Sequence, residues 1–121
     1  MKIVDYRDPK PIYEQIADYY KHMILKGVLL SDEQLPSVRA LAMEIGTNPN
    51  TVQKAFTLLE SEGYIYAVKG RGNFVKADDD LTKKKSREIT EKLRSLFEEA
   101  RSIHLNVDEL IKDAKEGMKH D

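Results

Sequence analysis

Residues 47–59 read Thr-Asn-Pro-Asn-Thr-Val-Gln-Lys-Ala-Phe-Thr-Leu-Leu, and they predict a short helix with one buried and one displayed face. Asn48 is a favourable N-cap because its side-chain oxygen can accept a hydrogen bond from a free amide, and Pro49 suits the first helical position. The residues at i, i+3, i+4 and i+7 are apolar: Val52, Ala55, Phe56 and Leu59. The remaining surface carries amide, hydroxyl and ammonium groups, on Asn50, Thr51, Gln53, Lys54 and Thr57. Such groups read base edges and phosphates.

Composition narrows the class of protein. The chain has 121 residues, enough for one modest domain with an appendage, and it has no apolar run of the ~18 residues that a membrane span needs. Its first residues, 1–5, lack the apolar core of a secretory signal, and the absence of cysteine excludes disulfides and thiolate metal sites. We therefore expect a cytoplasmic protein. The net charge of -1 does not by itself indicate nucleic-acid binding, so such a function would depend on where the cations lie.

Two further helices are expected before residue 47. The first runs from Pro11 to Gly27, and its apolar stripe comprises Ile12, Ile16, Tyr19, Tyr20, Met23 and Ile24. The connection 28–35 can hold a brief strand. Pro36 and Ser37 then begin a second helix, which Gly46 ends and whose inward face is Val38, Leu41, Ala42 and Ile45.

The elements around residues 47–59 predict a helix-turn-helix followed by a β-hairpin. Only Gly46 and Thr47 separate the second and third helices, and so tight a turn is typical of the helix-turn-helix. After Gly63, residues 64–68 alternate in the manner of a strand, residues 69–72 form a turn, and residues 73–75 return. The tip of this hairpin carries two cations and two glycines.

The order and wording of these motifs are similar to a known family. Leu-Pro-Ser-Val-Arg at 35–39, the third helix, Leu-Glu-Ser-Glu-Gly-Tyr-Ile at 59–65 and Gly-Arg-Gly-Asn-Phe-Val at 70–75 resemble the winged helix-turn-helix of GntR-type bacterial transcription regulators. The resemblance covers residues 9–76. The Asn-Pro-Asn-Thr-Val wording at 48–52 resembles the small YtrA-type branch, whose members end in a short helical tail instead of a large ligand-binding domain.

The resemblance implies a set of DNA contacts. It places the third helix in the major groove and the hairpin wing at the adjacent minor groove. Many members carry arginines where Pro49 and Gln53 stand here, so fewer charges would reach the bases. The implied DNA-binding residues are Ser37, Arg39, Asn48, Pro49, Asn50, Thr51, Gln53, Lys54, Lys69, Gly70, Arg71 and Gly72.

Each contact also has a plainer interpretation. Arg39 can reach a phosphate or pair with a nearby carboxylate such as Glu44. Asn50 and Gln53 can each form two hydrogen bonds with adenine, yet polar side chains on a helix are usually only solvated. Thr51 can simply assist the cap. A charged hairpin tip is usually a solubility device, so its DNA contact depends on the helix beside it.

The last part of the chain, residues 77–121, predicts two amphipathic helices joined by a short link. An αα-hairpin cannot enclose its own apolar faces, so it must pack on the first domain or on a second chain. We favour a homodimer, because two-fold symmetry is usual for helix-turn-helix proteins that read a palindrome. The expected dimerisation residues are Ile89, Leu93, Leu96, Phe97, Ala100, Leu110, Ile111 and Ala114.

No pattern indicates catalysis, a metal or a cofactor. The acidic run 78–80 is explained as the cap of the tail helix, with metal chelation by its three aspartates as the alternative. The cations at 83–87 can touch phosphates or form a solvated face. His22, His104 and His120 lie on separate elements and match no ligand spacing. Some relatives carry an aminotransferase-like domain, but this tail is far too short for one.

The sequence therefore predicts an α+β fold: a winged helix-turn-helix DNA-binding domain at 1–76 and a helical dimerisation tail at 77–121. The expected function is a non-enzymatic, homodimeric transcription regulator, a repressor, that binds a palindromic operator in double-stranded DNA. No membrane partner is expected, and a small-molecule effector is not indicated. The rival interpretation is a winged-helix module in which the third helix binds a partner protein without sequence-specific DNA binding.

Overall fold

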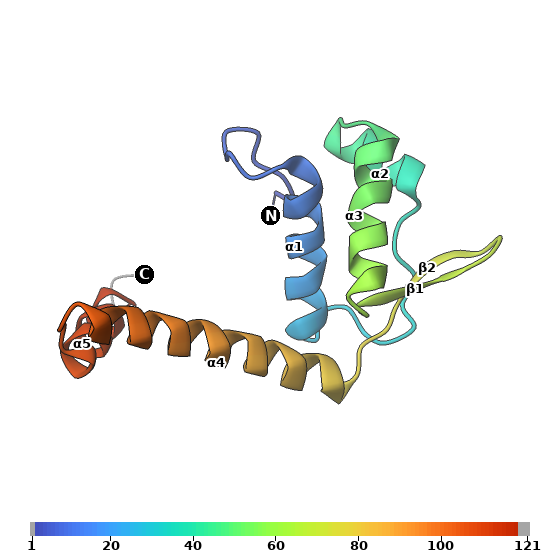
Figure 1. Cartoon of the computed structure of the whole chain (residues 1–121). Helices are drawn as coiled ribbons and strands as arrows, with labels where there is room; N and C mark the ends of the chain where they lie inside the picture. The colour runs from blue at the N-terminus through green and yellow to red at the C-terminus, as the bar shows by residue number, and fades with distance from the viewer. Residues whose placement is uncertain (1, 119–121) are drawn as a thin grey trace. The chain divides into compact units, whose positions relative to one another are not determined.

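The computed structural model describes residues 2–118, which form helices and one two-stranded sheet (Figure 1). In chain order the elements are α1 (Ile12–Leu25), α2 (Val38–Ile45), α3 (Pro49–Ser61), β1 (Ile65–Val68), β2 (Gly72–Val75), α4 (Asp79–Ser102) and α5 (Val107–Met118). This order confirms the predicted α+β class. The chain divides into two compact units, Met1–Thr82 and Lys83–Asp121.

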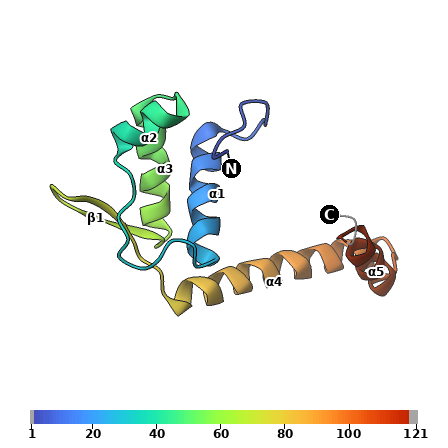
Figure 2. The same cartoon turned by 180° about the vertical axis from the view of Figure 1, so that it is seen from behind.

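The core of the first unit lies among α1, α2 and α3. Helices α1 and α3 run side by side, and α2 packs against α3, as both views show (Figures 1 and 2). The largest fully buried side chains are Phe56, Ile16, Leu41, Leu59, Ile65, Val52 and Val75. Five of these come from the faces predicted to point inward on the three helices. Tyr20 of α1 meets Phe56 of α3 edge to face, and burial raises the pKa of Tyr20 to about 12.

The ends of α2 and α3 are fixed by the residues that the sequence indicated. Ser37 Oγ accepts a hydrogen bond from the amide of Ala40 at 3.1 Å, which caps α2. Gly46 ends that helix with φ at 77°, in the left-handed region that favours glycine. Asn48 Oδ1 accepts a hydrogen bond from the amide of Asn50 at 2.7 Å. The predicted tight turn between α2 and α3 is therefore confirmed.

The two strands pair antiparallel in the register Ile65–Val75 to Val68–Gly72. This confirms the predicted hairpin, with two shifts: β1 begins one residue later than expected, and β2 begins at Gly72, which was predicted to lie in the turn. Tyr64 lies outside β1 because its backbone N–H donates to the carbonyl of Leu59 and so closes α3. The connection between α1 and α2, where a brief strand was expected, forms one isolated bridge between Gln34 and Phe74.

Each of the two tail helices begins at a side-chain cap, as predicted for the first of them. Asp78 Oδ1 accepts from the amide of Leu81 at 3.1 Å, and Asn106 Oδ1 accepts from the amide of Glu109 at 3.1 Å. Leu81 is buried in the core of the first unit. Among the helices described, none is long and apolar enough to cross a membrane.

Removing the ring of Phe56 should strongly destabilise the first unit. Phe56→Ala leaves a cavity in the core, and such truncations cost ~3–5 kcal/mol. Met43→Ala is the control, because the Met43 side chain is 78% exposed and should lose little stability. Urea unfolding measures both. Equal midpoints for the two variants would contradict the placement of Phe56.

Candidate nucleic-acid interface

Helix α3 exposes the polar face that the sequence predicted. Val52, Ala55, Phe56 and Leu59 are buried, which fixes how the helix is rotated about its axis. The opposite side chains are exposed, and they are Asn50, Gln53, Lys54 and Thr57. Because these four side chains contribute little to the core, they are available to contact a ligand outside the protein.

Two of these side chains are held by neighbours. Gln53 Nε2 donates to Thr57 Oγ1 at 3.3 Å, one turn further along α3. This bond leaves one amide hydrogen and the carbonyl oxygen of Gln53, the two groups that pair with an adenine edge. Lys54 Nζ lies 4.0 Å from the centre of the Tyr13 ring, a cation–π contact with α1.

The first turn of α3 contains the helix cap and also leaves polar groups available to a ligand. Asn48 uses its side-chain oxygen for the cap and keeps its amide hydrogens. Pro49 occupies the first helical position, where it forfeits no hydrogen bond. Thr51 is half-buried, and its backbone N–H donates to the carbonyl of Asn48 at 3.0 Å. The side chain of Asn48 is thus an available donor at the start of the helix.

The start of α2 presents one cation. The Ser37 oxygen accepts the cap hydrogen bond, so its hydroxyl hydrogen is still available for donation. Arg39 follows on the exposed side of the helix. Within residues 2–118, Arg39 forms no ion pair, so the pairing with Glu44 considered from the sequence does not occur.

The tip of the hairpin is a short turn with two exposed cations. Arg71 donates its backbone N–H to the carbonyl of Val68 at 2.9 Å, which closes the turn. Gly70 and Gly72 have φ values of 78° and 115°, which side chains rarely adopt. Lys69 and Arg71 are exposed and form no ion pair in the described part of the chain.

The hairpin is tied to its surroundings by two acidic side chains. Glu60 Oε2 on α3 accepts from the backbone N–H of Ala67 in β1 at 3.0 Å. Tyr66 Oη donates to Asp32 Oδ1 at 2.6 Å, and this hydrogen bond raises the pKa of Tyr66. The Tyr66 ring also stacks on Phe74, with 5.6 Å between ring centres.

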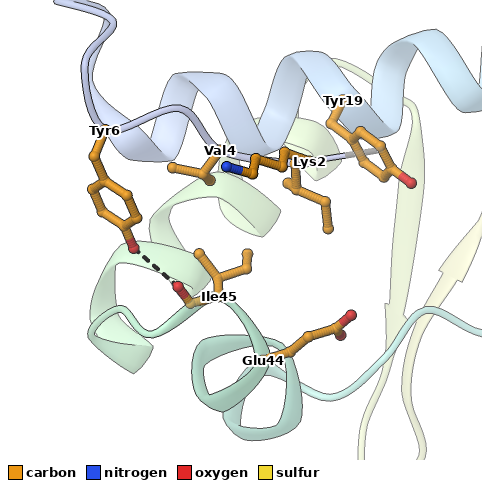
Figure 3. A pocket seen from close by; sticks show the side chains of 7 residues that line it. Lys2, Val4, Tyr6, Tyr19, Glu44 and Ile45 are labelled. Carbon is orange, nitrogen blue, oxygen red and sulfur yellow. Dashed lines mark hydrogen bonds between the residues drawn. The ribbon is translucent and has the colours of Figure 1, made fainter.

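The N-terminal segment contacts the turn between α2 and α3. Tyr6 Oη donates to the carbonyl of Ile45 at 3.0 Å and lies 3.4 Å from the carbonyl of Gly46 (Figure 3). The buried Gln15 anchors this segment, because its amide bonds to the backbone of Asp5 and Lys10. A pocket of about 420 Å³ lies between the segment, α1 and the end of α2.

Sequence patterns missed the contacts of Tyr6 and Tyr13. Both residues contact an element that is distant in sequence. Tyr13 lies beside the apolar stripe of α1, and no periodic pattern relates it to Lys54. Helical spacing relates residues three or four positions apart, so no pattern could have identified these pairs.

The acidic and histidine residues form no metal site among the described residues. Asp78 caps α4, as predicted for the acidic run 78–80. His22 and His104 belong to different elements, and His120 lies outside the described residues.

Three helices, a tight turn between the second and third, and a hairpin after the third define a winged helix-turn-helix protein. The model of the gntR family of bacterial regulatory proteins matches residues 12–75. The chain therefore belongs to the gntR family, and it is a DNA-binding transcription regulator.

Known proteins resemble both parts of the chain. The HTH-type transcriptional repressor YtrA of Bacillus subtilis is 39% identical, over 98% of each chain. A structure described as a transcriptional antiterminator from Listeria monocytogenes has a TM-score of 0.73 and 37% identity, covering 98% of this chain and 90% of that one. AraR(DBD) in complex with operator ORE1 has a TM-score of 0.53 and 30% identity, covering 60% of this chain and 88% of that one.

The cap of α3 should be worth a measurable part of the stability. Asn48→Ala removes the acceptor for the amide of Asn50 and should cost about 0.5–2 kcal/mol. Asn48→Ser keeps an acceptor at the same position and should recover most of the loss. Chemical denaturation of the three proteins compares them. An alanine variant as stable as the parent would show that the cap contributes nothing.

Proposed function

We propose that this protein is a homodimeric repressor that acts in the cytoplasm on a palindromic operator. In each protomer, α3 enters the major groove with Asn50 and Gln53 towards the bases, while Asn48 and Lys54 bind near the start of the helix. Arg39 contacts a phosphate beside it. The tip at residues 69–72 lies on the adjacent backbone, where its glycines allow close approach. Residues 1–76 read DNA, and residues 77–121 hold the dimer.

The observation that carries this proposal is the exposed polar face of α3 with unpaired cations beside it. Amide groups that can satisfy a base edge protrude from a helix whose opposite face is locked into the core. Arg39, Lys69 and Arg71 have no carboxylate partner within residues 2–118, so each can neutralise a phosphate. Local cations thus serve DNA binding although the net charge is -1.

The exposed apolar faces of the tail support the dimer. Leu93, Leu96 and Leu110 are 46%, 58% and 43% exposed, although they belong to the stripes of α4 and α5. Together with their neighbours they line a groove of about 570 Å³ between the two helices. A contiguous apolar surface of this kind marks an interaction site. A second copy of the tail offers the same surface, as an isologous two-fold interface requires.

The first test separates base reading from phosphate binding. Gln53→Ala should relax the preference at one base position per half-site and cost ~1–3 kcal/mol on the selected operator. Asn50→Ala should do the same at a different position. Lys69→Ala should weaken binding to all sequences alike and reduce the salt dependence. Selection from a random duplex pool, followed by titration at two salt concentrations, measures these effects.

Lys112→Ala, which removes a cation from the tail helix α5, is the matched control for Lys69→Ala and should leave the base preferences unchanged. If the Asn50, Gln53 and Lys69 variants all bound the selected operator as the parent does, α3 and the wing would not be the DNA-binding surface. If the DNA affinity of the parent did not depend steeply on salt, the result would instead favour the rival interpretation, a winged-helix module that binds a partner protein.

The second test addresses the tail. The double variant Leu93→Glu, Leu110→Glu should be a monomer whose first unit is still folded. The reason is that a charge cannot be buried at an apolar interface without a partner. Operator affinity should then collapse, since each half-site is held alone. The half-sites of the parent should be inverted and spaced by about 34 Å or a multiple of it. Analytical ultracentrifugation and operator titration measure these changes.

Ser95→Glu adds the same charge to α4 outside the apolar groove and is the control. It should stay dimeric and bind the operator normally. A parent that sediments as a monomer at micromolar concentration would overturn the dimer, as would selected sites without two-fold symmetry.

A further inference from the structure

The connection between α1 and α2 is hydrogen-bonded to β2 along the outer edge of the hairpin. The backbone N–H of Asp32 donates to the carbonyl of Val75 at 2.7 Å, and that of Val75 donates to the carbonyl of Glu33 at 2.9 Å. The backbone N–H of Leu35 donates to the carbonyl of Asn73 at 2.9 Å. Residues 32–35 therefore follow β2 towards the tip of the wing.

Within this connection, the side chain of Gln34 reaches the tip itself. Its Nε2 donates to the carbonyl oxygen of Arg71 at 2.8 Å. A Cβ atom at position 72 would lie 3.1 Å from the same nitrogen, so the amide packs closely against Gly72. The absence of a side chain at Gly72 thus allows the hydrogen bond that fixes the backbone of Arg71.

The other end of the connection is anchored to the helix-turn-helix. Leu35, the residue after Gln34, is buried in the core, and Ser37 caps α2 two positions later. Arg39 lies in the first turn of that helix. Gln34 therefore joins the tip of the wing to a rigid segment that leads directly to Arg39.

The hydrogen bond between Gln34 and Arg71 matters because the hairpin is short. Its strands have four residues each, and an isolated two-stranded hairpin is marginally stable at best in water. The tip lies beyond the last strand pair, Val68 with Gly72. Without this hydrogen bond, a cation on the tip would have to be ordered when DNA binds, and the conformational entropy lost in that ordering lowers affinity.

We propose that Gln34 is a positioning residue for DNA binding, which holds Arg71 in fixed register with the start of α2. The proposal rests on the proposed function, in which Arg71 contacts the DNA backbone. Gln34 itself touches no DNA. Its hydrogen bond keeps the two arginines, Arg39 and Arg71, at a constant spacing, so that both meet their phosphates without rearrangement.

A double-mutant cycle on operator affinity tests this role. Gln34→Leu removes the donor and shortens the side chain by one bond, and it should weaken binding roughly threefold to tenfold, as expected for the loss of one hydrogen bond. In the background of Arg71→Ala the same change should have almost no effect. In the background of Gln53→Ala it should keep its full effect, because Gln53 lies on α3. A purely structural loss would act equally in both backgrounds.

Ser31→Ala is the matched control, since Ser31 is exposed in the same connection and its side chain forms no hydrogen bond in the described structure. It should bind as the parent does. If Gln34→Leu weakened binding by the same factor with and without the Arg71 side chain, the positioning role of Gln34 would be wrong. The proposed contact between the wing and DNA would not be affected by that result. If Arg71→Ala alone left operator affinity unchanged, the wing contact of the proposed function would fail, and this inference with it.

Discussion

The packing of α3 against α1 determines how the first unit is built. Val52, Ala55, Phe56 and Leu59 are almost fully buried, and burial of such side chains is worth ~1.5–3 kcal/mol for each of the larger ones. This packing leaves α3 a single rotational setting, so Asn50 and Gln53 must face outwards. The hairpin follows α3 directly and is bonded to it through Glu60, so the position of the wing also depends on this packing.

Local signals in the sequence were sufficient for the helices and the hairpin, but the brief strand expected in residues 28–35 forms only an isolated bridge. Asn48 with Pro49 marked the start of α3, and Gly46 marked the end of α2, because capping chemistry acts within a few residues. The candidate site was predicted only in part. The contacts of Lys54 with Tyr13 and of Gln34 with Arg71 join segments far apart in the chain, and no periodicity relates such pairs. Their prediction requires the tertiary structure.

The tail contrasts with the first unit although both are built from amphipathic helices. In the first unit three helices enclose their apolar faces, and both polar atoms of the buried Gln15 side chain are hydrogen-bonded. Among its described residues, the second unit has two helices and buries little beyond Ala100, while Leu96 remains mostly exposed. The amphipathic pattern in the sequence is equally clear in both units. What differs is the number of helices available to cover it.

The division of α3 into a core face and a free face has an evolutionary consequence. Substitutions at Asn50, Gln53 or Thr57 leave the packing of Phe56 unchanged, so they carry little of the stability cost that limits most sequence change. Duplicated copies of such a regulator can therefore diverge in the DNA that they bind while the fold stays intact. The orientation set by the core is common to all copies, and a handful of surface positions is enough to separate their regulatory targets.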